Sequence, residues 1–217
     1  MDRQVGRTGF TLAEVLITLG IIGVVAAMTI PTLMNKTQDK EFKEAAKEAF
    51  SKSSQAIQQM KNDEGGTLSG YGIDNAGLFK PVFMKYFKVI KDCNLLDCVA
   101  GSYTSDVYTS LSGDPADTNI GAEGQFVTSD GMFFNIQDSV YAGIYIIVDV
   151  NGYMKKPNIY GKDTFVFQIL NDNLVPMGAP NTYYQSPSWY CDRTDAHNLT
   201  STQGLGCMCN VMKGANY

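Results

Sequence analysis

The sequence has little of what active sites and nucleic-acid interfaces usually need. It contains one histidine, His197, and no GxSxG, HExxH, Walker A or GxGxxG pattern. Catalytic triads, zinc proteases and nucleotide-binding loops therefore lack their usual residues. Its 17 basic side chains are outnumbered by 22 acidic ones, and no long cationic cluster is present that would neutralise phosphates. We expect neither an enzyme nor a nucleic-acid-binding protein, and we expect His197 to be an ordinary exposed side chain.

All five cysteines lie after residue 90. Two spacings are typical of loop closures, Cys93 with Cys98 and Cys191 with Cys207, and Cys209 could equally replace Cys207. In an oxidising compartment we expect these pairs to form disulfides. A zinc site is the competing interpretation, but the repeated CxxC or HxxxH pairs of such sites are missing.

One long apolar stretch covers residues 10–34, and its only charged side chain is Glu14. A helix of this length spans about 35 Å, which is enough to cross a bilayer core. The polar leader before it, residues 1–9, has two arginines and one aspartate. This charge bias favours keeping the leader in the cytoplasm.

An ordinary secretory signal would also begin with a basic segment followed by an apolar stretch. Here the apolar stretch is longer than the usual signal core, and the small pair Ala26-Ala27 is followed by more apolar residues. A carboxylate near the start of the apolar helix is also expensive in lipid and needs a reason. These features favour a retained anchor over a removed signal.

The segment GFTLAEVLI at residues 9–17, with Pro31 further along the helix, resembles type IV prepilins and the pseudopilins of type II secretion. The resemblance implies that a prepilin peptidase cuts between Gly9 and Phe10 on the cytoplasmic side and N-methylates Phe10. It also implies that Glu14 pairs with the terminal ammonium of a neighbouring subunit. In a low-dielectric environment such a pair would select one register of subunit stacking.

Pro31 lacks an N–H and clashes with the preceding helical turn. We therefore expect it to kink or locally melt the helix, as the resemblance also implies for filaments, and Gly20 and Gly23 add flexibility.

Residues 35–64 predict an amphipathic continuation of the helix, which ends at Gly65-Gly66. Its apolar side chains recur at three- and four-residue steps, and we expect them to pack on the head at residues 65–217. They are Phe42, Ala45, Ala46, Ala49, Phe50, Ser53, Ile57 and Met60.

The head reads as a small antiparallel meander, so the predicted fold class is α+β, a pilin-like fold with the long helix on one face of the sheet. We expect a short helix over 78–90 that is interrupted at Pro81, and a surface loop over 102–124. The expected strands are 125–128, 132–136, 143–150, 164–170 and 174–176.

The connection between two of these strands, residues 149–163, concentrates oxygen ligands at Asp149, Asn151, Asn158 and Asp163. Calcium prefers such oxygens, and some pseudopilins use a calcium-bound loop, but the spacing does not match an EF-hand. The alternative is an Asx-rich turn whose side chains cap their own backbone, and the sequence favours this alternative over a calcium site.

The expected function is structural: a minor pilin or a pseudopilin of a type IV pilus or type II secretion filament. Its partners would be the prepilin peptidase, other pilin subunits, an inner-membrane assembly platform and, before assembly, membrane lipid. The chain would cross the bacterial inner membrane once, with the head outside the cytoplasm, and then join a periplasmic or cell-surface filament. The alternative is a membrane-tethered binding module for adhesion, DNA uptake or cargo capture, in which aromatic side chains of the C-terminal loop would form the contact.

Overall fold

The structure is a computed structural model of the chain. It describes residues 9–68, 71, 76–99, 107–116, 124–139, 143–194 and 200–215. Its contacts divide the chain into two compact units, Met1–Lys40 and Glu41–Tyr217. The two units are described separately below.

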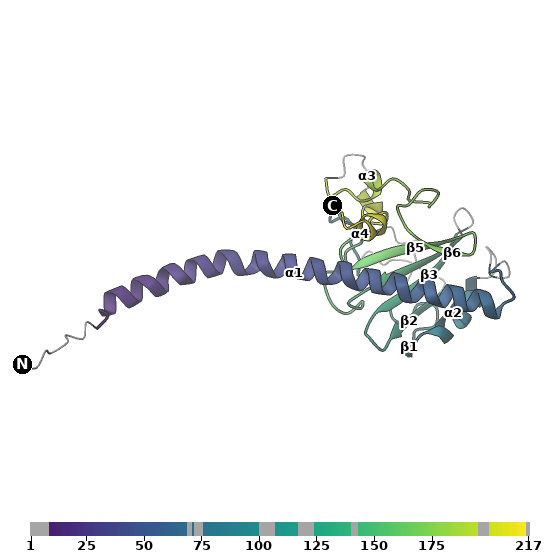
Figure 1. The fold of residues 1–217 in the computed structure, drawn as a ribbon, viewed down its shortest axis with the longest axis horizontal. Helices are drawn as coiled ribbons and strands as arrows, with labels where there is room; N and C mark the ends of the chain where they lie inside the picture. Colours follow the sequence, from purple (N-terminus) through teal and green to yellow (C-terminus); the bar gives the residue numbers. More distant parts are fainter. Residues whose placement is uncertain are drawn as a thin grey trace, which may run out of the picture. The chain divides into compact units, whose positions relative to one another are not determined.

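One helix, α1 (Leu12–Asp63), runs through both units and has 52 residues (Figure 1). Pro31 lies inside it, and the helix is unbroken there. The expected local melting is therefore wrong for the single chain, because helix propagation on both sides offsets the one backbone bond that proline removes. The loosening that the resemblance implies for a filament stays a prediction.

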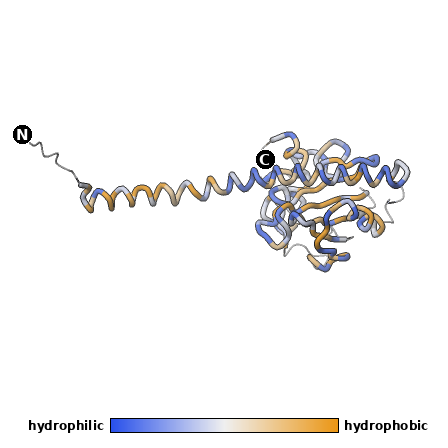
Figure 2. The backbone as a smooth tube through the Cα atoms, turned by 60° about the horizontal axis from the view of Figure 1, so that its bottom comes forward, coloured by the Kyte–Doolittle hydropathy of each residue, from blue (hydrophilic) through white to orange (hydrophobic). Residues whose placement is uncertain are grey.

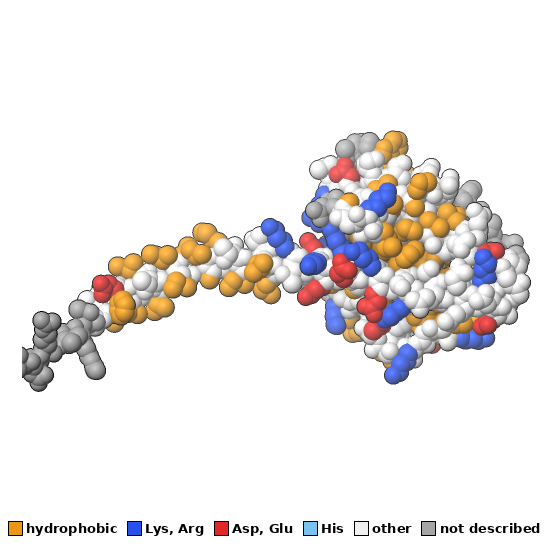
Figure 3. Space-filling view, in the orientation of Figure 1, with side chains coloured by type: hydrophobic (Ala, Val, Ile, Leu, Met, Phe, Trp, Pro, Cys, Tyr) orange, Lys and Arg blue, Asp and Glu red, His pale blue; other side chains and the backbone are white. Residues whose placement is uncertain are grey.

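The first unit exposes its apolar side chains all around the helix, from Leu12 to Met34. Figure 2 shows this half of α1 as hydrophobic, and Figure 3 shows hydrophobic side chains covering it. A helix that is apolar on every side is stable only when lipid or other helices cover it. None of the described residues buries this half of α1.

In the second unit, α1 buries one stripe, as the sequence predicts. The buried side chains recur at helical spacing and join a hydrophobic cluster with one face of the sheet. The ring of Phe50, at the edge of the stripe, meets Phe167 edge-on with centroids 5.4 Å apart. The stripe consists of Phe42, Ala46, Ala49, Ser53, Ala56, Ile57 and Met60.

The described residues form a six-stranded sheet in which every strand pairs antiparallel with the next, in the order β1-β2-β3-β4-β5-β6. The predicted meander is confirmed. The hairpin turn between β2 and β3 lies at 129–131, where Gly131 adopts a φ of +88°. The strands are β1 (Val89–Asp92), β2 (Gly124–Thr128), β3 (Phe133–Ser139), β4 (Gly143–Asp149), β5 (Thr164–Leu170) and β6 (Asn173–Pro176).

Both faces of the sheet are buried, whereas the sequence led us to expect a helix on one face only. The first face packs against α1 and α2 (Ala76–Phe83). The second face packs against loops, among them residues 107–116, and against Tyr184 and Leu205 of the C-terminal segment, whereas Met208 and Val211 join the cluster on the first face. Strands covered on both sides have nearly continuous apolar runs, and β4 and β5 have such runs. The C-terminal segment holds α3 (Pro187–Tyr190), η4 (Thr200–Thr202) and α4 (Met208–Met212).

Two sequence predictions in the head are wrong. Pro81 lies inside α2 and does not interrupt it, and the chain continues through the 3₁₀ turn η2 (Met84–Tyr86) into β1. The helix expected over 78–90 is also wrong for Val89 and Ile90, which begin strand β1. The expected surface loop is partly wrong too, since Tyr108, Ser110 and Ala116 are buried under the second face; residues 102–106 and 117–123 of that loop lie outside the described residues.

Matched isoleucines test this assignment of the core. Ile136 on β3 is fully buried, whereas Ile90 on β1 is 64% exposed. Ile136→Ala should lower the free energy of unfolding by about 2–5 kcal/mol, because it removes buried methyl groups and leaves a cavity. Ile90→Ala should change it by about 0.5 kcal/mol or less. Thermal unfolding of the detergent-solubilised chain measures both, and equal losses would contradict the assigned core.

Candidate functional site

The N-terminal boundary of α1 lies beside the predicted processing site. Gly9 and Phe10 precede the helix, which begins at Leu12. The side chain of Phe10 is 89% exposed. The peptide bond between Gly9 and Phe10 therefore lies in non-helical, accessible backbone, as a protease substrate requires.

Glu14 folds back onto Thr11 at the start of the helix. The backbone N–H and the hydroxyl of Thr11 both donate to Glu14 Oε2, each at 2.8 Å. In return, Thr11 Oγ1 accepts the backbone N–H of Glu14 at 3.2 Å. This is a capping box, in which the side chains of the N-cap and N3 residues satisfy each other's orphan amides. The sequence analysis missed the role of Thr11, although the Thr-x-x-Glu spacing is a readable signal for it.

The helix that follows is long and apolar enough to cross a membrane. Within α1, a window of 18 residues has a mean hydropathy of 2.2 and none of it is buried. The only carboxylate in the apolar half is Glu14, at its very beginning. A non-helical glycine-phenylalanine junction, a capped glutamate and a fully exposed apolar helix therefore follow one another within 26 residues of sequence, 9–34.

Comparison with protein families gives one match at this segment: residues 6–30 match the prokaryotic N-terminal methylation motif. The chain carries the prepilin-type signature. This motif supports a type IV pilin-like or pseudopilin-like protein, and it points to a structural subunit and not to an enzyme. No curated protein and no solved structure matches the chain. The prepilin-type motif thus covers the anchor, and the head must be judged from its own residues.

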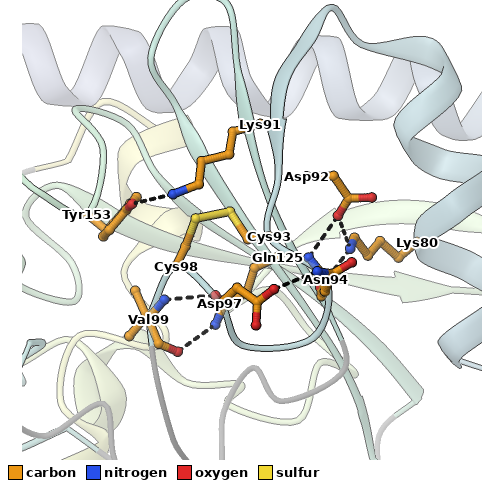
Figure 4. Close-up of a disulfide and its surroundings, with 10 residues drawn as sticks. All are labelled: Lys80, Lys91, Asp92, Cys93, Asn94, Asp97, Cys98, Val99, Gln125 and Tyr153. Carbon is orange, nitrogen blue, oxygen red and sulfur yellow. Dashed lines mark hydrogen bonds and ion pairs between the residues drawn. A yellow bond between two sulfur atoms is a disulfide. The ribbon is translucent and has the colours of Figure 1, made fainter.

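Two disulfides close loops of the head; the spacing had left Cys207 and Cys209 open as partners of Cys191. Cys93 joins Cys98, and Cys191 joins Cys207. Around the first disulfide (Figure 4), the side chain of Gln125 accepts the N–H of Val99 at 3.0 Å and donates to its carbonyl at 3.2 Å. The loop is thus fixed to strand β2 by side-chain bonds as well as by the disulfide.

The buried Lys80 fixes the other side of the same loop. Its ammonium donates to Asp92 Oδ1 at 2.6 Å and to the carbonyl of Asn94 at 2.7 Å (Figure 4). The bond from Lys80, and after it the bond from the backbone N–H of Asn94, lower the pKa of Asp92. A β-carbon at Gly124 would lie 2.3 Å from Lys80 Cδ, so the glycine lets the lysine stem pass over β2.

Cys209 is a free, buried thiol. Residues two apart on a helix point to nearly opposite sides, and Cys209 and Cys207 lie two apart at the start of α4. A β-carbon at Gly161 would lie 2.6 Å from Cys207 Sγ, whereas one at Gly178 would lie 3.1 Å from Cys209 Cβ. The two side chains therefore contact different neighbours, and Cys191 forms its disulfide with Cys207.

Peptide mapping without reduction tests this pairing. We expect disulfide-linked peptides for Cys93 with Cys98 and for Cys191 with Cys207. Cys209 should react with an alkylating reagent only after denaturation, because its side chain is buried. A peptide that links Cys191 to Cys209 would contradict the assignment.

The candidate calcium residues lie in one loop on the second face of the sheet, and Asp149 and Asp163 are both buried. Asp149 Oδ1 accepts the N–H of Gly152 at 2.9 Å, and its Oδ2 accepts the hydroxyl of Tyr108 at 2.9 Å. Asp163 accepts the N–H groups of Asn158 and Ile159, at 2.8 and 2.6 Å. Both carboxylates thus cap backbone, as the Asx-turn alternative predicted.

The side-chain amides of the loop use their N–H groups and leave their oxygens as candidate cation ligands. Asn151 donates to the carbonyls of Lys155 and Lys156, and Asn158 donates to that of Tyr153. The Oδ1 atoms of both asparagines are buried without a hydrogen-bond partner, and oxygens of this kind suit calcium. Among the described residues, however, no group of three or more His, Cys, Asp or Glu could hold a metal. Calcium at this loop stays a prediction.

The electrostatics of the two carboxylates can be tested by pH. Burial, together with the charge of Asp163, raises the pKa of Asp149 from its ordinary value of 3.8 to about 7. Burial also raises the pKa of Asp163. The folded chain therefore holds a proton on Asp149 in a pH range where the unfolded chain has lost it.

We expect the free energy of unfolding to fall by about 4 kcal/mol as the pH rises from about 4 to about 7. Asp149→Asn should remove most of this slope, because its amide group can donate to Tyr108 and its oxygen can accept the same N–H groups. Circular dichroism of the detergent-solubilised chain between these pH values measures both proteins.

An equal slope in the two proteins would contradict the raised pKa. The same pair of proteins also tests the calcium prediction at pH 7.5. A melting temperature that rises with added calcium in the wild type and not in Asp149→Asn would assign a cation to these oxygens.

The C-terminal segment carries a connected row of aromatic rings. Tyr183 meets Tyr184 at a centroid distance of 4.9 Å, and Tyr184 meets Tyr190 at 5.1 Å. Tyr183 and Trp189 are about half exposed. The predicted exposure of His197 lies outside the described residues.

Proposed function

We propose that the chain is a structural subunit, a minor pilin or a pseudopilin, of a type IV pilus or type II secretion filament. Prepilin peptidase cleaves it after Gly9 and N-methylates Phe10. The mature chain then enters the filament through the apolar half of α1. Glu14 pairs there with the terminal ammonium of a neighbouring subunit.

One observation carries this proposal: the methylation motif lies on a helix whose apolar side chains are exposed on all sides. A helix of this kind needs lipid before assembly and neighbouring helices after it. Its single carboxylate is costly in either apolar environment unless a cation pairs with it. A filament of parallel subunits supplies both the apolar contacts and the cation.

The proposed location follows from the same helix. Before assembly the chain crosses the bacterial inner membrane once, with the leader in the cytoplasm and the head outside. The two disulfides support an oxidising environment for the head. The remaining partners are an inner-membrane assembly platform and other pilin or pseudopilin subunits.

A second candidate function is supported by the exposed rings of the head. In a membrane-tethered binding module, Tyr183 and Trp189 would contact a surface or a secreted cargo, because aromatic side chains dominate interface energies. The net charge of −5 weighs against DNA as the ligand. This candidate adds to filament assembly and does not replace it.

The intact mass and N-terminal sequence of the protein from its native membrane test the main proposal. We expect a mature chain that begins at N-methylated Phe10 when prepilin peptidase is present, and an uncut chain when the peptidase gene is deleted. Gly9→Val should also keep the leader, because cleavage in the resembling family follows a glycine.

A chain that begins after Ala27, in either strain, would indicate an ordinary signal peptidase and would contradict the proposal. Cleavage at Phe10 without the peptidase would contradict the assigned enzyme. Thr18→Val is a suitable control, since it changes a helix residue away from the junction and should be processed as the wild type is.

A further inference from the structure

The hydroxyl of Thr11 makes two hydrogen bonds at the start of α1. Thr11 Oγ1 donates its proton to Glu14 Oε2 and at the same time accepts the backbone N–H of Glu14. The backbone N–H of Thr11 donates to the same oxygen. Both donors thus converge on Oε2, and the structure records no bond to Oε1 from any described residue.

This arrangement meets a specific need of the apolar segment. After Glu14, the next charged side chain of α1 is Lys36, six helical turns away. Glu14 therefore has no ion-pair partner of its own helix within reach, and an ionised carboxylate without donors is costly in apolar surroundings. The two donors of Thr11 satisfy one carboxylate oxygen, fix the side-chain rotamer and leave the second oxygen open.

We infer that Thr11 is the positioning residue of subunit assembly: it holds Glu14 by Oε2 and presents Oε1 to the terminal ammonium of a neighbouring subunit. This inference rests on the proposed function, in which Glu14 makes that pair. The ammonium then bonds to a carboxylate that is already oriented, so less side-chain entropy is lost on association.

Four variants separate this role from a simple helix cap. Thr11→Ser keeps the hydroxyl. Thr11→Val keeps the shape and removes it. Thr11→Gly also removes it, but glycine is a fair N-cap, so the start of the helix is largely retained. Thr18→Val is the matched control, because the hydroxyl of Thr18 bonds only to the carbonyl of Val15.

Each variant is expressed as the full chain in its native bacterium. Intact mass reports cleavage after Gly9, and in vivo cross-linking reports the fraction of mature chain in multimers. Thr11→Ser and Thr18→Val should match the wild type. Thr11→Val and Thr11→Gly should be cleaved normally and should form about fivefold fewer multimers, because the carboxylate then has to be ordered on association.

Three results would overturn the inference. Wild-type assembly of Thr11→Val would show that the hydroxyl is not needed. Wild-type assembly of Thr11→Gly, with a loss in Thr11→Val, would leave only a helix-capping role. Failed cleavage of Thr11→Val would assign Thr11 to the peptidase step.

Glu14→Gln distinguishes this inference from the proposed function. If Glu14→Gln is cleaved and fails to form multimers while Thr11→Val assembles normally, only the inference about Thr11 fails. If Glu14→Gln assembles as the wild type does, the pairing that both proposals share fails.

Discussion

The structure depends on one constraint: a single continuous helix has to be stable in an apolar environment along its first half and against the head and water along its second half. Its first half is apolar on every side and needs lipid or other helices, whereas residues 41–63 bury one stripe and leave the other face to water. The transition is made without a break, since α1 is helical from Leu12 to Asp63. Glu14 is the single carboxylate of the apolar half, and the N–H and hydroxyl of Thr11 both donate hydrogen bonds to it.

Much of the fold was readable from the sequence, for physical reasons that particular elements show. The buried stripe of α1 follows the helical period, and β4 and β5 are apolar runs bounded by turn residues. Strand β1 could not be recognised, because its side chains are mostly exposed and its pairing with β2 decides its conformation. The predicted interruption at Pro81 was wrong for a related reason: the packing of α2 in the core outweighs the free-energy cost of one proline in a helix.

The candidate site divides in the same way. The segment 9–17 could be read directly, because its chemistry depends on residue order, and the methylation motif matches there. The spacing of the cysteines indicated the pair Cys93–Cys98, but it could not choose between Cys207 and Cys209 as the partner of Cys191. That choice required the direction of each side chain on α4. The Asx-rich loop showed its oxygens in the sequence, and only the structure shows that both carboxylates bind backbone N–H groups while the two asparagine Oδ1 atoms have no partner.

The strand order has a consequence for biogenesis. Each strand of the described sheet pairs with the one that precedes it in the chain, so each can pair as soon as its predecessor is in place. A chain that is threaded through a membrane from its anchor onward delivers α1 first and then β1 to β6 in turn. Each new strand finds its edge already in place, so the head can grow as it emerges and need not wait for its C-terminus. The last segment to arrive, which carries Cys207, then adds Leu205 to the cluster on the second face and Met208 and Val211 to the cluster on the first.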